Sequence, residues 1–432
     1  MAGVRGRTDQ KLGRLTIEET LAGVYHEQGA RLLAYLIGRF GDFELAEDAL
    51  QEALVSALEG WERDGVPAKP TAWLMVTARN KAIDILRRDQ NLQHKLQGLG
   101  MERVIQKMER EPELPDEFPD ERLKLLFTCC HPALSLEAQV ALMLKTVGGL
   151  STEEVAHAFL VPLPTMAQRL VRAKRKVLEA GIPFRVPGKK ALPERLQAVL
   201  AVLYLVFNEG YAPHSGSAWV REGICAEAIR LTRLLTQLLE LEGLPDALPE
   251  ARGLLALMLL HHARTPARID VDGELVLLEA QERERWDQGL IEEGTTVLDR
   301  ALEDGMPGPY QIQAAISALH VQAKHASETD WTQIVLLYDR LLELQPTPVV
   351  ALNRAAAVAM LHGPATGLLL LEPLGGELEG YLPFHAARAE LLRRAGRQAE
   401  ARAAYLQALS MSTNHAEQRF FERQVQALTD EN

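Results

Sequence analysis

Two prolines between two helix-like segments constrain the fold of this chain more than any other feature. Residues 151–154 read Ser-Thr-Glu-Glu, the pattern of a capping box that begins a helix. Pro162 and Pro164 follow, and proline is excluded from a helix interior because it lacks the N–H that the helix needs. Pro164 suits the first turn of a second helix, where that N–H would have no partner anyway. The stretch 150–177 therefore predicts two helices joined by a short turn.

The second of these helices is apolar on one side and basic on the other. Its apolar stripe is Met166, Leu170, Ala173 and Val177, which recur at helical spacing. Between them come Arg169, Arg172, Lys174, Arg175 and Lys176, with no acid until Glu179. The stretch resembles a DNA-binding helix-turn-helix, whose second helix enters the major groove. An ordinary helical hairpin with a solvated basic face is the alternative.

Composition indicates an all-α protein of several domains. The 432 residues are 47% hydrophobic, aromatics make up 5%, and regular β-rich runs are hard to find. The three cysteines form no disulfide framework and fit a reducing compartment. The first residues lack the apolar core of a signal peptide, and the longest apolar run, 198–207, is too short to span a bilayer. We therefore expect a cytoplasmic protein that does not contact membranes.

The charge is distributed unevenly, although the net charge of −12 at first argues against nucleic-acid binding. Residues 1–190 carry 27 Lys and Arg against 26 Asp and Glu, whereas residues 191–432 carry 20 against 33. The acidity thus belongs to the C-terminal half. Basic residues are clustered in the N-terminal half, and a local basic face is what binds phosphates.

The N-terminal half reads as helices separated by a linker. A flexible tail at 1–16 precedes a helical domain at 17–89. Its helix 43–61 carries Asp48 and Glu52, four residues apart, with Gln51 nearby; this is either a solvated acidic face or a surface for a partner protein. Its helix 69–89 is basic, with Thr and Asn side chains able to bond phosphates or bases. Prolines and acids at 90–119 then predict a linker.

The order of these elements resembles a bacterial RNA polymerase sigma factor of the extracytoplasmic-function (ECF) class. The motifs are Asp-Ala-Leu-Gln-Glu-Ala at 48–53, Thr-Ala-Arg-Asn-Lys-Ala-Ile-Asp at 77–84, and the helix-turn-helix that ends in Leu-Val-Arg-Ala-Lys-Arg-Lys-Val. Residues 20–89 match the family's region 2, and residues 120–180 match its region 4. We delimit the second domain as 120–183. Ala167 departs from the family pattern, in which many relatives carry Lys.

The resemblance implies three sets of site residues. The acidic helix of the family docks on the β′ subunit of core RNA polymerase, the basic helix of region 2 engages the minus-ten promoter element, and the region 4 helix reads the minus-thirty-five element. Carried to this chain, the polymerase-binding residues are Asp48, Gln51 and Glu52; the minus-ten residues are Arg79, Asn80, Asp84, Arg87 and Arg88; and the minus-thirty-five residues are Thr165, Gln168, Arg169, Arg172, Lys174 and Arg175.

Neither a metal site nor a cofactor is expected. Cys129, Cys130 and His131 have no second Cys or His pair at ligand spacing, so buried thiols are the favoured interpretation. His261 and His262 are adjacent on a predicted helix, where neighbouring side chains diverge.

A polar turn is predicted after the apolar helix 194–207. The segment resembles the Phe-Asn-Glu-Gly-Tyr stretch of a helical domain that follows region 4 in one subgroup of ECF sigma factors. It is either a ligand pocket or a structural corner, and the corner is favoured. Its candidate residues are Asn208, Glu209, Tyr211 and His214.

The C-terminal half divides into a helical domain at 190–305 and a repeat-like array at 306–432. Gly363 and Gly396 interrupt Ala-rich helices and lie 33 residues apart, close to the 34-residue period of tetratricopeptide (TPR) repeats. Segment 281–287 is predicted to be a solvated helix anchored by Trp286. Stacked repeats usually bind peptides or subunits, and a purely structural layer is the alternative.

The leading functional hypothesis is a sigma factor that binds core RNA polymerase and promoter DNA, with a C-terminal half that regulates it through a protein or a small ligand. The alternative is a helix-turn-helix regulator with a TPR partner domain that does not act through core polymerase. An enzyme, centred on Glu209, Tyr211, His214 and Ser215, is disfavoured because no nucleophile, base and orienting group form a clear set.

Overall fold

A computed structural model describes residues 17–93, 119–159, 161–211, 215–216, 222–270, 274–303, 305 and 307–430. The chain divides into two compact units, Met1–Val199 and Leu200–Asn432. The all-α prediction is confirmed: within the described ranges the strands are the pair β1 (Ser215–Gly216) and β2 (Thr413–Asn414), which run parallel. The predicted tail at 1–16 and nearly all of the predicted linker at 90–119 lie outside the described residues. None of the described helices is both long enough and apolar enough to cross a bilayer.

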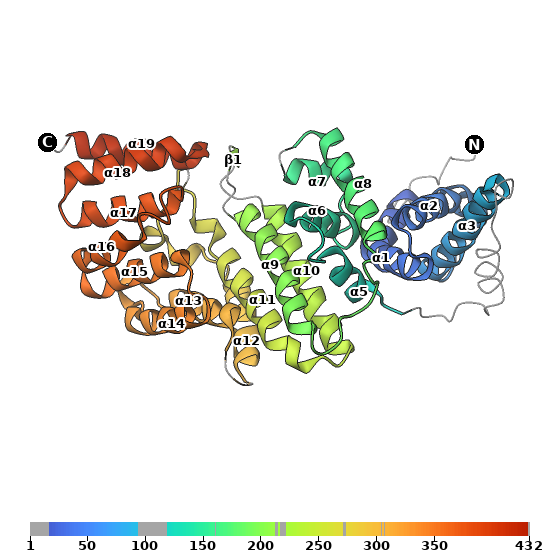
Figure 1. Cartoon of the computed structure of the whole chain (residues 1–432), viewed down its shortest axis with the longest axis horizontal. Helices are drawn as coiled ribbons and strands as arrows, with labels where there is room; N and C mark the ends of the chain where they lie inside the picture. Colours follow the sequence, from blue (N-terminus) through green and yellow to red (C-terminus); the bar gives the residue numbers. More distant parts are fainter. Residues whose placement is uncertain are drawn as a thin grey trace, which may run out of the picture. The chain divides into compact units, whose positions relative to one another are not determined.

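Unit 1 begins with three helices, α1 (Ile17–Phe40), α2 (Phe43–Asp64) and α3 (Pro70–Gln93) (Figure 1). Asp42 caps α2, because its carboxylate accepts bonds from the backbone N–H groups of Glu44 and Leu45 at 2.8 and 3.1 Å. Leucines fill the core of these helices and alanines let them approach closely; the fully buried residues include Leu32, Leu36, Ala46, Ala49, Leu74 and Ala82. These helices form the scaffold for two of the predicted surfaces.

Two large apolar or aromatic residues of these helices, Val76 and Tyr25, are exposed. Val76 is 37% exposed because it lies about 200° around α3 from the buried Leu74. Tyr25 is 39% exposed. Its ring lies beside Gly29 of its own helix, where an added Cβ would come within 3.0 Å of the ring. The buried stripe of α1 therefore excludes Tyr25.

The second part of unit 1 consists of α5 (Arg122–Cys129), α6 (Leu136–Thr146), α7 (Thr152–Ala158) and α8 (Leu163–Glu179). The predicted capping box is present: Ser151 N–H donates to Glu154 Oε2 at 2.7 Å, and Glu154 N–H donates to Ser151 Oγ at 3.1 Å. Pro164 occupies the first turn of α8. The four residues of the predicted apolar stripe of α8 are all buried. The helix-turn-helix prediction is thus confirmed in its local detail.

The segment after α8 returns to α1 before the next helix begins. A Cβ at Gly38 of α1 would lie 2.7 Å from the ring of Phe184, so this glycine lets the ring approach. The next helix, α9 (Leu192–Tyr211), contains the division between the two units. Its first turns belong to unit 1, where the Arg195 guanidinium donates to the carbonyl of Phe127. The sequence had placed the start of the C-terminal domain at residue 190, before this helix.

Unit 2 continues with α10 (Glu222–Leu241), η1 (Pro245–Ala247), α11 (Leu248–His262) and α12 (Gln288–Leu302). The residues of α11 from Leu254 to Leu260 are all buried, as expected for a helix that is apolar on every side. Two glycines allow its neighbours to approach. A Cβ at Gly253 would lie 2.7 Å from the backbone nitrogen of Gln311, and one at Gly294 would lie 3.0 Å from Leu260.

Between α11 and α12 the described residues form the short 3-10 turns η2 (Thr265–Ala267), η3 (Leu278–Ala280) and η4 (Arg283–Arg285), and an isolated antiparallel bridge joins Ile269 to Leu275. The predicted solvated helix at 281–287 is therefore wrong. The anchoring role of Trp286 is confirmed, because this side chain is 3% exposed. The buried indole of Trp286 attaches this irregular segment to the core.

The rest of unit 2 is a stack of helices, which Figure 1 shows from orange to red. Gly363 and Gly396 have φ values of 92° and 74° and end helices where the sequence predicted breaks. Buried alanines, among them Ala355, Ala359, Ala401 and Ala404, allow close packing. The helices are α13 (Pro309–Gln322), α14 (Trp331–Leu344), α15 (Pro348–His362), α16 (Pro364–Leu371), α17 (Leu382–Arg394), α18 (Gln398–Met411) and α19 (His415–Asp430), with the short turns η5 (Ala326–Glu328) and η6 (Glu372–Leu374).

Candidate nucleic-acid interface

The solvent-facing side of α8 carries several of the residues that the sequence predicts to contact the minus-thirty-five element. Arg172, Thr165 and Gln168 are exposed, and Arg169 lies with its guanidinium carbon 5.7 Å from the centroid of the Phe159 ring. A groove of about 470 Å³ runs beside them. The groove is lined by Thr165, Gln168, Arg169, Arg172 and Lys176 of α8, and by residues 133–135 and Ala138 at the start of α6. Lys176 is a further basic residue of this face and was not among the predicted minus-thirty-five residues.

Lys174 does not share this groove. Its ammonium lies 2.5 Å from the carboxylate of Glu47 on α2, and the two side chains are 11% and 20% exposed. Arg175, also predicted to contact DNA, is 69% exposed and pairs with Glu179 at 3.3 Å. The predicted minus-thirty-five residues therefore lie on different faces of α8. Successive residues of a helix are about 100° apart around its axis, so Lys174 points to nearly the opposite side of α8 from Arg172.

The acidic residues predicted to bind polymerase lie beside residues of the predicted minus-ten set. A surface groove of about 610 Å³ is lined by residues of both α2 and α3. Its lining includes Asp48, Gln51, Glu52, Val55, Lys81 and Arg88. Val55 is 54% exposed, and Glu52 lies 3.6 Å from Lys81. The predicted polymerase-binding residues and one predicted minus-ten residue, Arg88, thus line the same groove.

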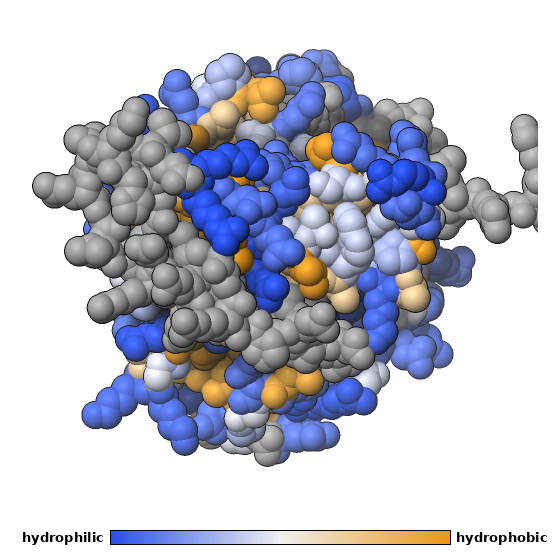
Figure 2. Space-filling view, turned by 90° about the vertical axis from the view of Figure 1, so that its right-hand side faces the viewer, coloured by the Kyte–Doolittle hydropathy of each residue, from blue (hydrophilic) through white to orange (hydrophobic). Residues whose placement is uncertain are grey.

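The remaining minus-ten candidates lie along α3. Asn80, Asp84 and Arg87 are exposed, and Asp84 lies 3.7 Å from Arg87. Arg79 is half-buried, and its Nε has no hydrogen-bond partner among the described residues. Figure 2 views the molecule from the side of α2 and α3 and shows hydrophilic residues over much of this face, with small apolar spots between them. Polar, solvent-facing side chains of this kind suit contacts with a phosphate backbone or with unpaired bases.

The cysteines are buried thiols, as the sequence favoured. Cys129, Cys130 and Cys225 are free and buried. Burial raises the pKa of Cys129 to about 12, against the opposing effect of the Thr146 hydroxyl, which lies 3.3 Å from its sulfur. No group of three or more His, Cys, Asp and Glu side chains in the described part of the chain is arranged to hold a metal ion.

The Phe-Asn-Glu-Gly-Tyr segment is helical, so the predicted polar turn at 208–211 is wrong. These residues complete α9, because Phe207 and Tyr211 lie one turn apart and stack, with ring centroids 5.5 Å apart. A Cβ at Gly210 would lie 2.8 Å from the backbone nitrogen and the sulfur of Cys225, so only glycine lets α10 approach here. Asn208 hydrogen-bonds the hydroxyl of Tyr204, and burial raises the pKa of that phenol. Glu209 is half-buried, and His214 lies outside the described residues.

Comparison with known proteins matches three ranges of the chain to described protein families. The model of Sigma-70 region 2 matches residues 24–92, and that of Sigma-70 region 4 matches residues 124–177. A family of unknown function (DUF6596) matches residues 195–302. No solved structure matches the chain.

Two relatives illustrate how the chain is composed. An uncharacterized protein of Rhizobium meliloti (strain 1021) is 45% identical over 402 residues, which cover 92% of this chain and 93% of the relative. The ECF RNA polymerase sigma factor SigL of Mycobacterium tuberculosis (strain ATCC 25618 / H37Rv) is 31% identical over 165 residues, which cover 37% of this chain and 89% of the relative. With both sigma regions present in order and a sigma factor matched over most of its length, the chain belongs to the family of ECF RNA polymerase sigma factors.

Proposed function

We propose that this sigma factor binds core RNA polymerase through the β′ subunit, directs it to specific promoters, and is regulated in cis by its C-terminal half. The observation that carries the proposal is the order of the two sigma regions in one chain. Region 2 would supply polymerase binding and minus-ten contacts, and region 4 would supply minus-thirty-five contacts. The chain would act by positioning DNA and polymerase, without covalent chemistry of its own.

The groove between α2 and α3 supports separate roles for these helices, with α2 binding polymerase and α3 contacting DNA. Asp48 and Glu52 offer negative charge at its α2 side, beside the exposed apolar side chain of Val55. Arg88 and Lys81 offer positive charge at its α3 side. A partner helix could therefore pack on the α2 side while a nucleic-acid strand follows α3.

The C-terminal half would bind a regulatory partner on the same polypeptide that carries the two sigma regions. Its stacked helices suit binding of a peptide or a subunit, as repeat arrays often do, and we propose that they form a TPR-like extension of the Phe-Asn-Glu-Gly-Tyr domain. The helix α9 contains the division between the two compact units, so we propose that regulation acts through the chain that joins them.

The first prediction tests polymerase binding. The double substitution Asp48→Lys and Glu52→Lys is expected to lower the affinity for purified core RNA polymerase by at least about tenfold, because each reversal puts like charge where complementary charge was. Fluorescence anisotropy of the labelled chain measures the affinity, and run-off transcription on a genomic promoter library measures the activity. Glu62→Lys is the matched control, since Glu62 is exposed on the same helix but does not line the groove. Unchanged core affinity and transcription in the double variant would favour a regulator that does not act through polymerase.

The second prediction concerns the contact between Lys174 and Glu47, which joins α8 to α2 within unit 1. Removing one partner of a largely buried ion pair leaves the other charge uncompensated, so Glu47→Ala is expected to release α8 from α2. The affinity of the free chain for a minus-thirty-five duplex should then rise by about fivefold, equivalent to about 1 kcal/mol. Glu44→Ala removes the same charge from an exposed position of α2. Equal affinities for the two variants would show that the pair does not restrain α8.

A further inference from the structure

The last helix of the array contacts a segment that precedes the array in the sequence. We call residues 274–279 the strap; they lie between η2 and α12. The backbone of the strap is extended at Leu277, with φ −64° and ψ 149°. Glu274 of the strap contacts Arg419 of α19, which is 145 residues further along the chain. In an open stack each repeat contacts only its neighbours, so the stack by itself does not require this contact.

Glu274 binds two arginines of α19 at once. Arg419 Nε lies 2.8 Å from one carboxylate oxygen of Glu274, and Arg423 Nη2 lies 2.8 Å from the other. Because the two arginines are four residues apart on α19, their side chains share a face and reach the same carboxylate. The side chain of Glu274 is 17% exposed, whereas those of the arginines are 46% and 51% exposed. A second acidic group can therefore approach these arginines from the solvent.

Two further contacts continue along the strap. Both carboxylate oxygens of Glu279 lie 2.9 Å from Arg394 Nη2 on α17. Between the two acids, Leu275 packs against the buried cluster of α17, α18 and α19, which includes Tyr405 and Phe421. The strap thus presents an acid, a leucine and a second acid to arginines and apolar side chains. The surface that receives it matches an extended acidic segment in both charge and apolarity.

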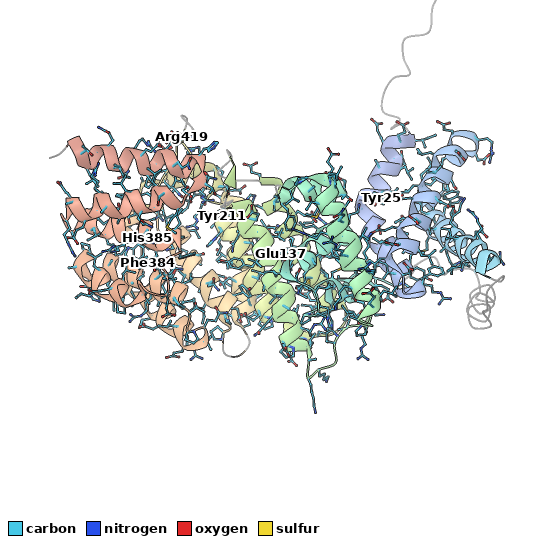
Figure 3. All side chains as sticks on the ribbon, turned by 45° about the horizontal axis from the view of Figure 1, so that its top comes forward. Tyr25, Glu137, Tyr211, Phe384, His385 and Arg419 are labelled. Carbon is cyan, nitrogen blue, oxygen red and sulfur yellow. The ribbon has the colours of Figure 1, made fainter. Side chains whose placement is uncertain are left out.

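The backbone of the strap is held by the first part of unit 2. Val276 N–H donates to the carbonyl of Arg268 at 2.9 Å, and Asp270 N–H donates to the carbonyl of Glu274 at 3.0 Å. The guanidinium carbon of Arg268 lies 3.7 Å from the centroid of the Tyr211 ring at the end of α9. Figure 3 labels Tyr211 and Arg419, between which these contacts run. The strap therefore connects α17 and α19 to the Phe-Asn-Glu-Gly-Tyr segment.

A separate contact holds the beginning of α19. Ser215 and Gly216 of β1 pair with Thr413 and Asn414 of β2 through backbone groups. Asn414 is fully buried, and its Oδ1 accepts the backbone N–H of Ala416 at 2.9 Å. Release of the strap would therefore leave α19 attached at its first residues, so it is a local change and not unfolding of unit 2.

The contacts of the strap are suited to reversible release. The arginines of α19 are about half exposed, and a partly exposed ion pair changes an equilibrium by roughly fivefold at most. Leu275 is only half-buried. An arrangement held by contacts of this strength has an open state that a partner can select.

We propose that the surface formed by Arg394, Arg419 and Arg423 is a docking surface for an extended acidic segment of a partner protein, and that the strap occupies this surface in the free chain. The partner segment carries an acid followed directly by leucine and a second acid five residues after the first, as in 274–279. Its docking displaces the strap and frees α17 and α19 from the first part of unit 2. The inference goes beyond the proposed function, because docking here requires neither polymerase nor DNA.

Hydrogen exchange of the full chain, followed by mass spectrometry, tests whether the strap is releasable. Glu274→Ala combined with Glu279→Ala should raise exchange in α19 by about tenfold or more, and exchange in α11 and α13 should not change. Salt at about 1 M, where the Debye length is about 3 Å, should raise exchange in α19 of the wild type and have little further effect on the double variant. Glu282→Ala is the matched control, since it removes an exposed acid three residues after the strap.

Fluorescence anisotropy with a labelled peptide of the sequence 274–281 tests the docking surface. The peptide should bind the double variant at least about tenfold more tightly than the wild type, because the tethered strap competes at high effective concentration in the wild type. A peptide with lysine in place of both acids should bind neither protein. Adding Arg419→Ala and Arg423→Ala to the double variant should remove binding of the first peptide.

Three results would overturn the proposal: equal exchange in α19 of the double variant and the wild type, equal peptide affinity for the two proteins, or equal binding of the lysine peptide. The salt experiment uses the wild type, so the test does not depend on the stability of any variant. These measurements need no polymerase or promoter, so a failure here is distinguishable from a failure of the proposed function.

Discussion

Replacing both Arg169 and Arg172 with alanine is expected to lower the affinity for minus-thirty-five promoter DNA by at least about thirtyfold. Both side chains line the groove of α8, together with Thr165 and Gln168. A base-reading arginine contributes about 1–3 kcal/mol, and the loss of a phosphate contact reduces the salt slope by about one. Electrophoretic mobility shifts at several salt concentrations measure both quantities.

The fold should survive this double substitution. Arg172 is exposed, and the buried stripe of α8 consists of other residues. Lys189→Ala is the matched control, because it removes an exposed basic charge outside the groove. Unchanged affinity in the double variant, with an unchanged melting curve, would mean that this face of α8 does not read the promoter.

The second large effect is expected at Gly253, where Gly253→Ala should destabilise unit 2. The added Cβ would lie 2.7 Å from the backbone nitrogen of Gln311. Gln311 has little freedom to move, since it is 2% exposed and its side chain donates to the carbonyl of Ala301. Overpacking of this kind costs about 1–3 kcal/mol, which lowers the melting temperature of a unit this size by about 2–4 °C for each kcal/mol.

Differential scanning calorimetry should show the loss in one transition, because Gly253 lies in unit 2 only. Gly223→Ala is the control: it lies in α10 with no atom within 4 Å of the added Cβ, so better helix propensity should make it neutral or stabilising. An unchanged melting curve for Gly253→Ala would contradict the close approach of α11 and α13. The same variant tests regulation in the full chain, since promoter-directed transcription should change if unit 2 controls unit 1.

Local signals made the helix-turn-helix predictable. A capping box, a proline pair and a stripe at helical spacing each act within a few residues, and Ser151, Glu154, Pro164 and Met166 all lie where the sequence placed them. The same holds for the breaks at Gly363 and Gly396, because a positive φ is a local property of glycine. The family resemblance rested on these local motifs and was matched by the comparisons.

Contacts between distant residues were not accessible to the same reasoning. Lys174 reads as one more base on α8, and only the packing of α2 beside it pairs it with Glu47. The segment at 208–211 reads as a turn because of its glycine and polar residues, yet the approach of Cys225 to Gly210 and the stack of Tyr211 on Phe207 keep it helical. Tertiary packing here outweighs local preference.

The sequence by itself determined that this chain is helical, where its sigma regions lie and which apolar residues of α8 are buried, since helical periodicity and caps depend on neighbours along the chain. Only the tertiary structure decided that Asp48 and Arg88 share a groove, and that Lys174 pairs with Glu47, which lies 127 residues away in the sequence. The physical reason is that electrostatic energies depend on distance and burial in space, and sequence separation specifies neither.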